Sequence, residues 1–181
     1  VIYVGMDFNI DPMSATIGVR TGTEGLHIID EIRIFSSNTQ EMAQELKTRY
    51  PKAKIWVYPD PAARQRKTSA GGATDISILQ NAGFVVKAPN AHDPVRDGIN
   101  AVNSRLCDAK GKRHLLVDPK CKYTIESLER HAYKQGTSQP DKDSGYDHMS
   151  DALRYMISYI WPVKRDMPKQ IPQRWGHNIR G

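Results

Sequence analysis

Two aspartates and a histidine open an amphipathic segment near the end of the chain. Asp147 and Asp151 are four residues apart and His148 lies three before Asp151, so in a helix all three share one side of the first turn. Hydrophobic residues recur on the other side, which predicts a helix from Asp147 to about Trp161 with a buried stripe. Such a group could bind a cation or transfer protons. The alternative interpretation is a surface helix whose acids favour its N-terminus electrostatically.

Two further aspartates follow apolar segments that have strand character. Asp7 ends a mostly apolar run, and Asp60 follows Ile55–Pro59 in the same way. Each could be a turn residue that caps nearby backbone N–H groups. If the two strands are neighbours in a sheet, however, both carboxylates leave it at one edge and form a negative cluster with Asp151.

A cluster of three aspartates is unfavourable unless a cation holds it, because close like charges repel. Carboxylate oxygens suit hard ions such as Mg²⁺ or Mn²⁺, and two such ions about 3.5–4 Å apart are a known device for phosphodiester hydrolysis. His148 could ligate a softer ion such as Mn²⁺, move protons, or be a solvated histidine at a helix start. Without metal we expect strain in the cluster, so that Asp151→Asn raises the melting temperature in EDTA.

Two basic segments could contact the phosphates of a nucleic acid. One follows Asp60 and would leave the sheet at the same edge as the carboxylates, and the other lies at a predicted turn around Gly111. Solvated charged loops are the alternative interpretation of both. The candidate DNA-binding residues in these segments are Arg64, Arg66, Lys67, Lys110, Lys112 and Arg113.

The composition of the 181 residues fits one globular domain with a polyanionic partner. Hydrophobic residues make up 39%, enough for a sizeable core, and the formal net charge is +6. No apolar run approaches the roughly 18 residues of a membrane span, so no membrane partner is expected. The two cysteines are too few for a disulfide framework. The sequence contains no P-loop, H-E-x-x-H or G-x-S-x-G motif, which argues against those chemistries.

The order of the predicted elements indicates a mixed α/β fold. Three strands joined by short turns predict an antiparallel meander, and helices alternating with strands follow it. We expect a five-stranded mixed sheet flanked by helices, and a small additional hairpin in which 115–117 pairs with 105–109. The expected strands are 2–8, 14–20, 26–35, 54–58 and 84–87, and the expected helices are 39–50, 75–81, 94–106, 123–134 and 147–161.

These elements and acids together resemble the ribonuclease H-like nuclease superfamily. More narrowly, the chain is similar to the C-terminal nuclease domain of the large terminase subunit of tailed bacteriophages. The resemblance covers residues 1 to about 160, and its most specific segment is the last of those that carry it. These segments are Gly5–Phe8, Val57–Asp60, Gly98–Val102, Leu116–Cys121 and Asp147–Tyr155.

The resemblance implies a metal-dependent endonuclease with a catalytic triad of Asp7, Asp60 and Asp151 that binds Mg²⁺ or Mn²⁺, with two ions expected. His148 and Asp147 would be further metal ligands. The family cleaves concatemeric double-stranded viral DNA during genome packaging, in the cytoplasm of the infected bacterium. Its partners are an ATPase motor domain that precedes the nuclease, a portal and a small terminase subunit.

The resemblance implies a nuclease domain over 1–161. The prolines and basic residues of 162–181 predict a C-terminal tail, which we expect to be extended or disordered. The tail from Lys164 onward is a candidate for contacts with the portal or the small subunit. The chain begins on a strand-like run without an initiator methionine. We therefore expect it to be a piece of a longer protein whose motor domain precedes Val1.

Three other functions are alternatives at this point. A resolvase or transposase-like nuclease of the same fold would prefer branched DNA or defined ends, and a substrate panel would distinguish it. An actin-like nucleotide-binding module shares the topology but needs glycine-rich phosphate loops, for which Asn9–Pro12 is a poor candidate. A DNA-binding module without catalysis would keep the basic loops but has no reason to place three acids at one edge.

Overall fold

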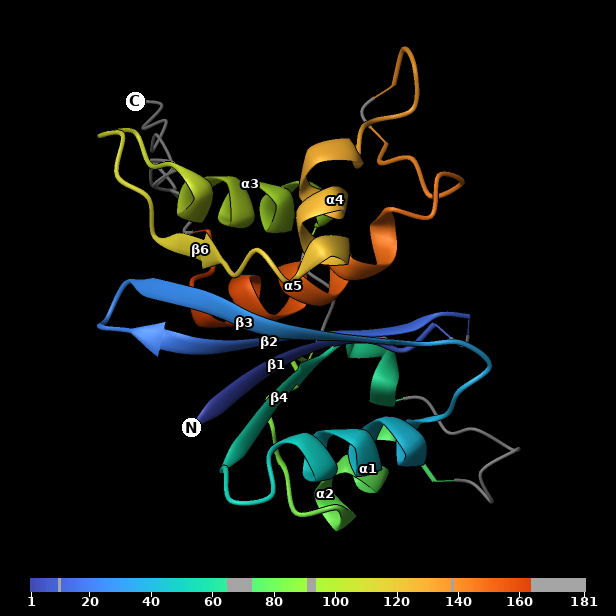
Figure 1. The fold of residues 1–181 in the computed structure, drawn as a ribbon. Helices are drawn as coiled ribbons and strands as arrows, with labels where there is room; N and C mark the ends of the chain where they lie inside the picture. Colours follow the sequence, from blue (N-terminus) through green and yellow to red (C-terminus); the bar gives the residue numbers. More distant parts are fainter. Residues whose placement is uncertain (10, 65–72, 91–93, 138, 164–181) are drawn as a thin grey trace, which may run out of the picture.

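A mixed sheet forms the centre of the computed structural model, which describes residues 1–9, 11–64, 73–90, 94–137 and 139–163 (Figure 1). The strands in this part of the chain are β1 (Ile2–Asp7), β2 (Met13–Thr21), β3 (Gly25–Ile34), β4 (Ile55–Pro59), β5 (Val85–Val86) and β6 (Leu115–Val117). The helices are α1 (Thr39–Arg49), the short 3-10 helix η1 (Pro61–Arg64), α2 (Asp75–Asn81), α3 (Val95–Leu106), α4 (Lys122–Arg130) and α5 (Asp147–Ile160). The strand order is β5-β4-β1-β2-β3-β6.

The strand directions bring the carboxyl ends of β1 and β4 to one edge of the sheet. β1, β2 and β3 form the predicted antiparallel meander, and β4 pairs in parallel with β1. The β1–β4 ladder joins Met6 to Pro59, and the N–H of Asp60 donates to the carbonyl of Met6 over 3.1 Å. Asp7 and Asp60 therefore leave neighbouring strands at the same edge of the sheet.

The mixed α/β class is confirmed, but the described sheet has six strands, and the hairpin predicted between 105–109 and 115–117 is wrong. Residues up to Leu106 belong to α3, and β6 pairs in parallel with β3, with Leu115 opposite Leu26. The N–H of Leu26 donates to the carbonyl of His114 over 2.8 Å, and Leu115 is buried in the core. The free edge of β3 thus offers 115–117 both backbone partners and apolar contacts, which a separate hairpin would not.

Helix α4 ends at Arg130, before the predicted end at 134. His131 leaves the helix with an extended backbone, and its Nδ1 lies 2.7 Å from the hydroxyl of Ser150 on α5. The chain then turns back so that Tyr133 forms a β-bridge with Pro140. These long-range contacts replace the last predicted turn of the helix.

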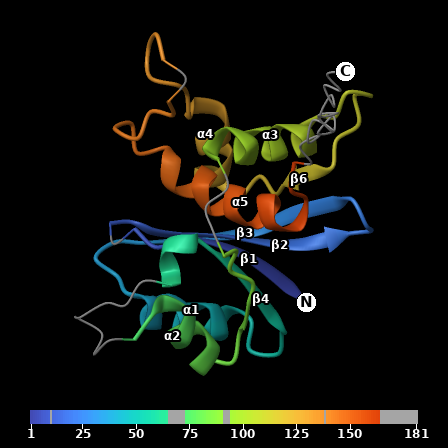
Figure 2. The same ribbon diagram turned by 180° about the vertical axis from the view of Figure 1, so that it is seen from behind.

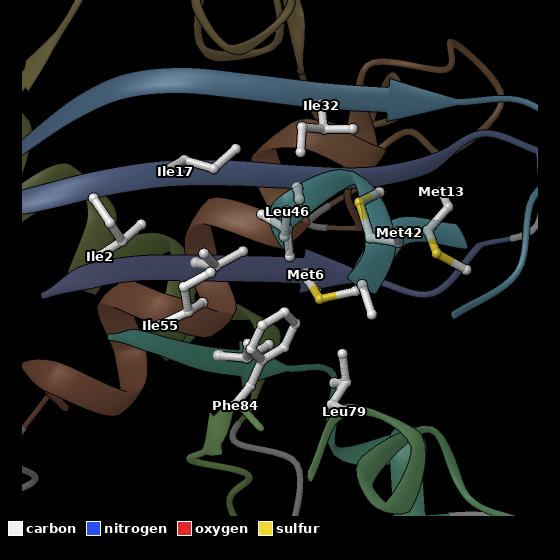
Figure 3. Packing of buried hydrophobic residues seen from close by; sticks show 14 residues of the cluster. Ile2, Met6, Met13, Ile17, Ile32, Met42, Leu46, Ile55, Leu79 and Phe84 are labelled. Atoms are coloured by element: carbon white, nitrogen blue, oxygen red, sulfur yellow. The ribbon is translucent and has the colours of Figure 1, made fainter. Parts of the chain in front are cut away.

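Helices cover both faces of the sheet, with α1 and α2 on one side and α3, α4 and α5 on the other (Figures 1 and 2). Alternate residues of β1 serve the two layers, because side chains on a strand alternate in direction. Val4 and Met6 join the core under α1, in one cluster with Leu46 and Leu79 (Figure 3). Tyr3 packs into the second core, with α5. No helix in the described residues is long and apolar enough to cross a membrane.

Gly5 allows α5 to approach the centre of the sheet. It lies between Val4 and Met6 and faces α5, where a Cβ atom would stand 2.0 Å from the backbone oxygen of Ala152. A residue without a side chain is needed at this contact, because a helix carbonyl cannot rotate aside as a flexible side chain can. The approach holds the first turn of α5, with Asp151, beside the carboxyl end of β1.

Gly5→Ala is expected to lower the free energy of unfolding by about 3 kcal/mol, because overpacking against a backbone carbonyl forces α5 away from β1. Gly22→Ala is the control, since that glycine has a φ of +70° and open space around it. Only its left-handed backbone is penalised, by about 1 kcal/mol. Urea unfolding at neutral pH measures both variants, and equal losses would contradict the close-packing argument.

Candidate active site

An open cleft of about 290 Å³ lies where β1 and β4 end beside the first turn of α5. Its walls include four aspartates that the sequence singled out, namely Asp7, Asp60, Asp147 and Asp151. Asp7, Asp147 and Asp151 are buried, with 9%, 5% and 8% of their surface exposed. Negative charge is therefore concentrated at a poorly solvated position, which is unfavourable unless each carboxylate finds a partner.

Asp7 and His148 form a contact that shifts both pKa values. Oδ2 of Asp7 lies 3.1 Å from Nδ1 of His148, which is also 3.0 Å from the side-chain amide of Asn9. A protonated Nδ1 donates to Asp7, whereas a bare Nδ1 accepts from Asn9. Burial raises the pKa of Asp7, and the charges of Asp151 and Asp60 add to this, outweighing the opposing effect of His148. The hydrogen bond with Asp7 in turn raises the pKa of His148.

Two residues of α5 hold the neighbouring carboxylates in place. Arg154 donates from Nε and Nη2 to Oδ1 of Asp151 over 3.0 and 2.9 Å. The hydroxyl of Tyr155 donates to Oδ2 of Asp60 over 2.8 Å, and Oδ1 of Asp60 accepts from the N–H of Ala62. Burial raises the pKa of Tyr155, as does the charge of Asp151, so this hydroxyl remains a donor at neutral pH. The sequence assigned no role to either residue, although their spacing of three and four from Asp151 was a usable signal.

The remaining oxygen atoms of the cleft fit a hard divalent cation. Oδ1 of Asp147 is buried without a hydrogen-bond partner in the described part of the chain, and Nε2 of His148 lies 3.7 Å from it. A cation would neutralise this oxygen and the carboxylate of Asp7 whose pKa is raised. Within the described ranges, no three Asp, Glu, His or Cys side chains already stand at metal-binding geometry. The ligands would therefore have to draw together on binding.

The cleft also contains two charged residues that the sequence did not single out. Asp75, in the first turn of α2, is 2% exposed and accepts a hydrogen bond from the hydroxyl of Thr39. Lys142, in the loop before α5, places its Nζ 3.9 Å from Oδ2 of Asp151. An acid in a helical first turn is common, and a lysine in a polar loop carries no periodic pattern. Only the fold reveals that both line the cleft.

Three of the predicted DNA-binding residues lie far from the cleft. Lys110, Lys112 and Arg113 precede β6, whose Leu115 pairs with Leu26 near the start of β3. The other end of β3 pairs with the start of β2, which lies beside Asp7. The loop that carries these three residues is consequently at the opposite edge of the sheet (Figure 1).

The basic segment after Asp60 is described only at its first residue. The guanidinium of Arg64 donates to the carbonyls of Ala88 and Pro89 over 2.8 and 3.1 Å, and so holds the chain after β5. Arg66 and Lys67 lie outside the described residues, as does the tail from Lys164 onward.

Solved structures with the same fold include phage terminase nucleases and a viral resolvase. The nuclease domain of the P22 large terminase has a TM-score of 0.65 and 17% identity, over 88% of this chain and 86% of that one. The nuclease domain of the bacteriophage SPP1 large terminase, with bound Mn, has a TM-score of 0.56 and 17% identity, over 87% and 85%. The Fowlpox virus resolvase in complex with Holliday junction DNA has a TM-score of 0.51 and 14% identity, over 88% and 97%.

Neither a protein-family model nor a curated protein sequence matches the chain. At identities this low, the likeness concerns the arrangement of the backbone. The chain has the ribonuclease H-like fold of the phage large terminase nuclease domains, and the resemblance expected from the sequence is confirmed at that level.

Asp151 is paired with Arg154, so we no longer expect its substitution to relieve strain in the metal-free cluster. The carboxylate expected to destabilise the metal-free fold is that of Asp7. Because folding raises the pKa of Asp7, its contribution to stability is present at low pH and is lost as the pH rises through the raised pKa. Asp7→Asn is expected to raise the free energy of unfolding at pH 7 in EDTA by about 1 kcal/mol. Asp151→Asn leaves a buried guanidinium without its carboxylate, and we expect a loss of about 2 kcal/mol.

Urea unfolding of the parent and both variants, in EDTA and in millimolar Mn²⁺, measures these changes. In Mn²⁺ the advantage of Asp7→Asn should shrink or reverse, because the parent gains binding free energy and the variant has lost an oxygen ligand. A change of the same sign for both variants in EDTA would show that Asp7 and Asp151 do not differ in the way their contacts indicate.

Proposed function

We propose that the chain is a divalent-metal-dependent endodeoxyribonuclease that cleaves double-stranded viral DNA concatemers during phage genome packaging. The observation that carries the proposal is the cleft in which carboxylates from the ends of β1 and β4 meet the first turn of α5. The fold shared with the P22 and SPP1 large terminase nuclease domains supports it, and so does the Mn bound to the SPP1 domain.

The residues of the cleft would hold the metal and keep its ligands oriented. The proposed ligands are Asp7, Asp60, Asp147, His148 and Asp151, for Mg²⁺ or Mn²⁺, with two ions expected. When bound there, the ions would supply activation of a water molecule and neutralisation of the leaving oxygen. Arg154 fixes Asp151 through Oδ1, while Oδ2 lies in the cleft, 3.9 Å from Nζ of Lys142. Tyr155 holds Oδ2 of Asp60 while the N–H of Ala62 holds Oδ1, and His148 orients Asp7 through Nδ1.

The proposed partners follow from the same function. Residues 1–161 would form the nuclease domain, and the basic residues 162–181 would form a tail able to contact the portal or the small terminase subunit. An ATPase motor domain would precede the chain, and the site of action would be the cytoplasm of the infected bacterium. The net charge of +6 suits double-stranded DNA as substrate, with Arg66 and Lys67 as candidate phosphate contacts.

A second candidate function is the resolution of branched DNA. The observation that favours it is the fold shared with the Fowlpox virus resolvase, whose structure contains Holliday junction DNA. The two functions differ in substrate shape, so a linear duplex and a four-way junction of the same sequence distinguish them. Preferential cleavage of the junction by tenfold or more would favour the resolvase.

Supercoiled plasmid is expected to be nicked and linearised by the chain in Mg²⁺ or Mn²⁺ and to remain intact in EDTA. Asp60→Asn should lower the cleavage rate by about 10³-fold, because bound metal contributes several kcal/mol to the transition state. Gel electrophoresis of the plasmid forms over time measures both effects.

The matched control is Glu45→Gln, which removes one carboxylate from the exposed side of α1, on the other face of the sheet. Its cleavage rate should equal that of the parent. Cleavage that persists in EDTA, or a parental rate in Asp60→Asn, would refute a metal-dependent role for this cleft.

A further inference from the structure

An arginine lies between two exposed aromatic rings near the candidate active site. The guanidinium of Arg33, on β3, is 5.1 Å from the ring centroid of Phe35 and 4.9 Å from that of Tyr123. Phe35 is 59% exposed and Tyr123 is 48% exposed. Two large aromatic side chains that meet on the surface around one cation form a patch that the core of the domain does not need.

The register of the sheet places this patch on the same face as the cleft. Asp7 pairs with Ser14 on β2, and Ser14 pairs with Arg33 on β3. Directly paired residues point to the same face, so the side chains of Arg33 and Asp7 do as well. The Cα atoms of the two residues are two strand spacings apart, roughly 10 Å. Its charge also acts on His148, where it opposes the rise of the pKa. Arg33 is therefore near the acidic cleft and on its side of the sheet.

The guanidinium of Arg33 is held between the rings, while its N–H groups have no carboxylate or hydrogen-bond partner among the described residues. Glu31, two residues earlier on the same strand face, is engaged elsewhere. Its carboxylate accepts from the N–H groups of Tyr123 and Thr124 over 3.0 and 2.7 Å. This bond caps α4 and fixes Tyr123 beside Arg33. The site is thus a positioned cation whose N–H donors are not used by any described residue.

We propose that Arg33 binds a backbone phosphate of the DNA strand that enters the cleft, with Phe35 and Tyr123 as the walls of that phosphate site. The inference rests on the proposed nuclease function and deepens it. A planar guanidinium can donate two parallel hydrogen bonds to a phosphate, and the outer faces of the rings can contact the neighbouring sugars and bases. The roughly 10 Å between Arg33 and Asp7 places this phosphate within a few nucleotides of the scissile bond.

Fluorescence anisotropy with a labelled DNA duplex in EDTA, where no cleavage is expected, tests the phosphate site. Arg33→Gln should weaken binding about tenfold at roughly 0.1 M salt and reduce the slope of log K against log salt concentration by about 0.9. Arg33→Lys keeps the charge but loses the planar fork, so it should keep the salt slope while binding more weakly than the parent. Phe35→Ala removes a wall and no charge, and it should weaken binding with the slope unchanged.

Lys52→Gln is the control, since it removes one exposed positive charge before β4, at the edge of the sheet opposite the cleft. Arg33→Gln that binds like Lys52→Gln, or a parent that binds no duplex, overturns the phosphate site. If the parent cleaves plasmid and Arg33→Gln binds the duplex as tightly as the parent, the phosphate site is rejected and the nuclease function stands. If Arg33→Gln weakens binding but the parent never cleaves DNA, the nuclease function is rejected and the phosphate site stands. Circular dichroism checks that each variant is folded. If Arg33→Gln does not fold, the affinity of Phe35→Ala for the duplex tests the phosphate site in its place.

Discussion

The contact between β1 and α5 at Gly5 sets the geometry on which the candidate active site depends. It brings the backbone oxygen of Ala152 into the space that a side chain at position 5 would occupy. A helix held further from the sheet would carry Asp147 and Asp151 away from the end of β1. The parallel pairing of β1 with β4 supplies the other side of the cleft. A backbone constraint, rather than any attraction between the acids, therefore gathers four carboxylates that repel one another.

The folded chain tolerates this repulsion because the carboxylates have unequal partners. Asp151 has a guanidinium, Asp60 a tyrosine hydroxyl and Asp7 a histidine nitrogen, whereas Oδ1 of Asp147 accepts no hydrogen bond from the described residues. Each of these three partners engages one oxygen atom of its carboxylate. These contacts offset part of the repulsion and keep the carboxylates at the cleft, where their oxygen atoms suit a hard cation.

The local parts of the site could be predicted from the sequence, and the parts that depend on register could not. Asp7 and Asp60 end apolar runs, and Asp151 follows Asp147 at helical spacing, so these positions follow from the residue pattern alone. Leu115–Val117 is too short to specify which strand it joins. Arg33 reaches the face of Asp7 only through two strand pairings, and a slip of one residue in either would turn it to the other face. Long-range register of this kind leaves no periodic trace in the chain.

The two outermost strands of the described sheet affect how readily copies of the chain can associate through their sheet edges. β5 has two residues and β6 has three, so each outer strand exposes only a short row of backbone N–H and C=O groups. A long free edge can recruit a strand from another copy and start the growth of aggregates. Here each outermost strand is too short to pair with more than two or three residues of a strand from another copy. Neither outermost strand of the described sheet therefore offers another copy a long template for pairing.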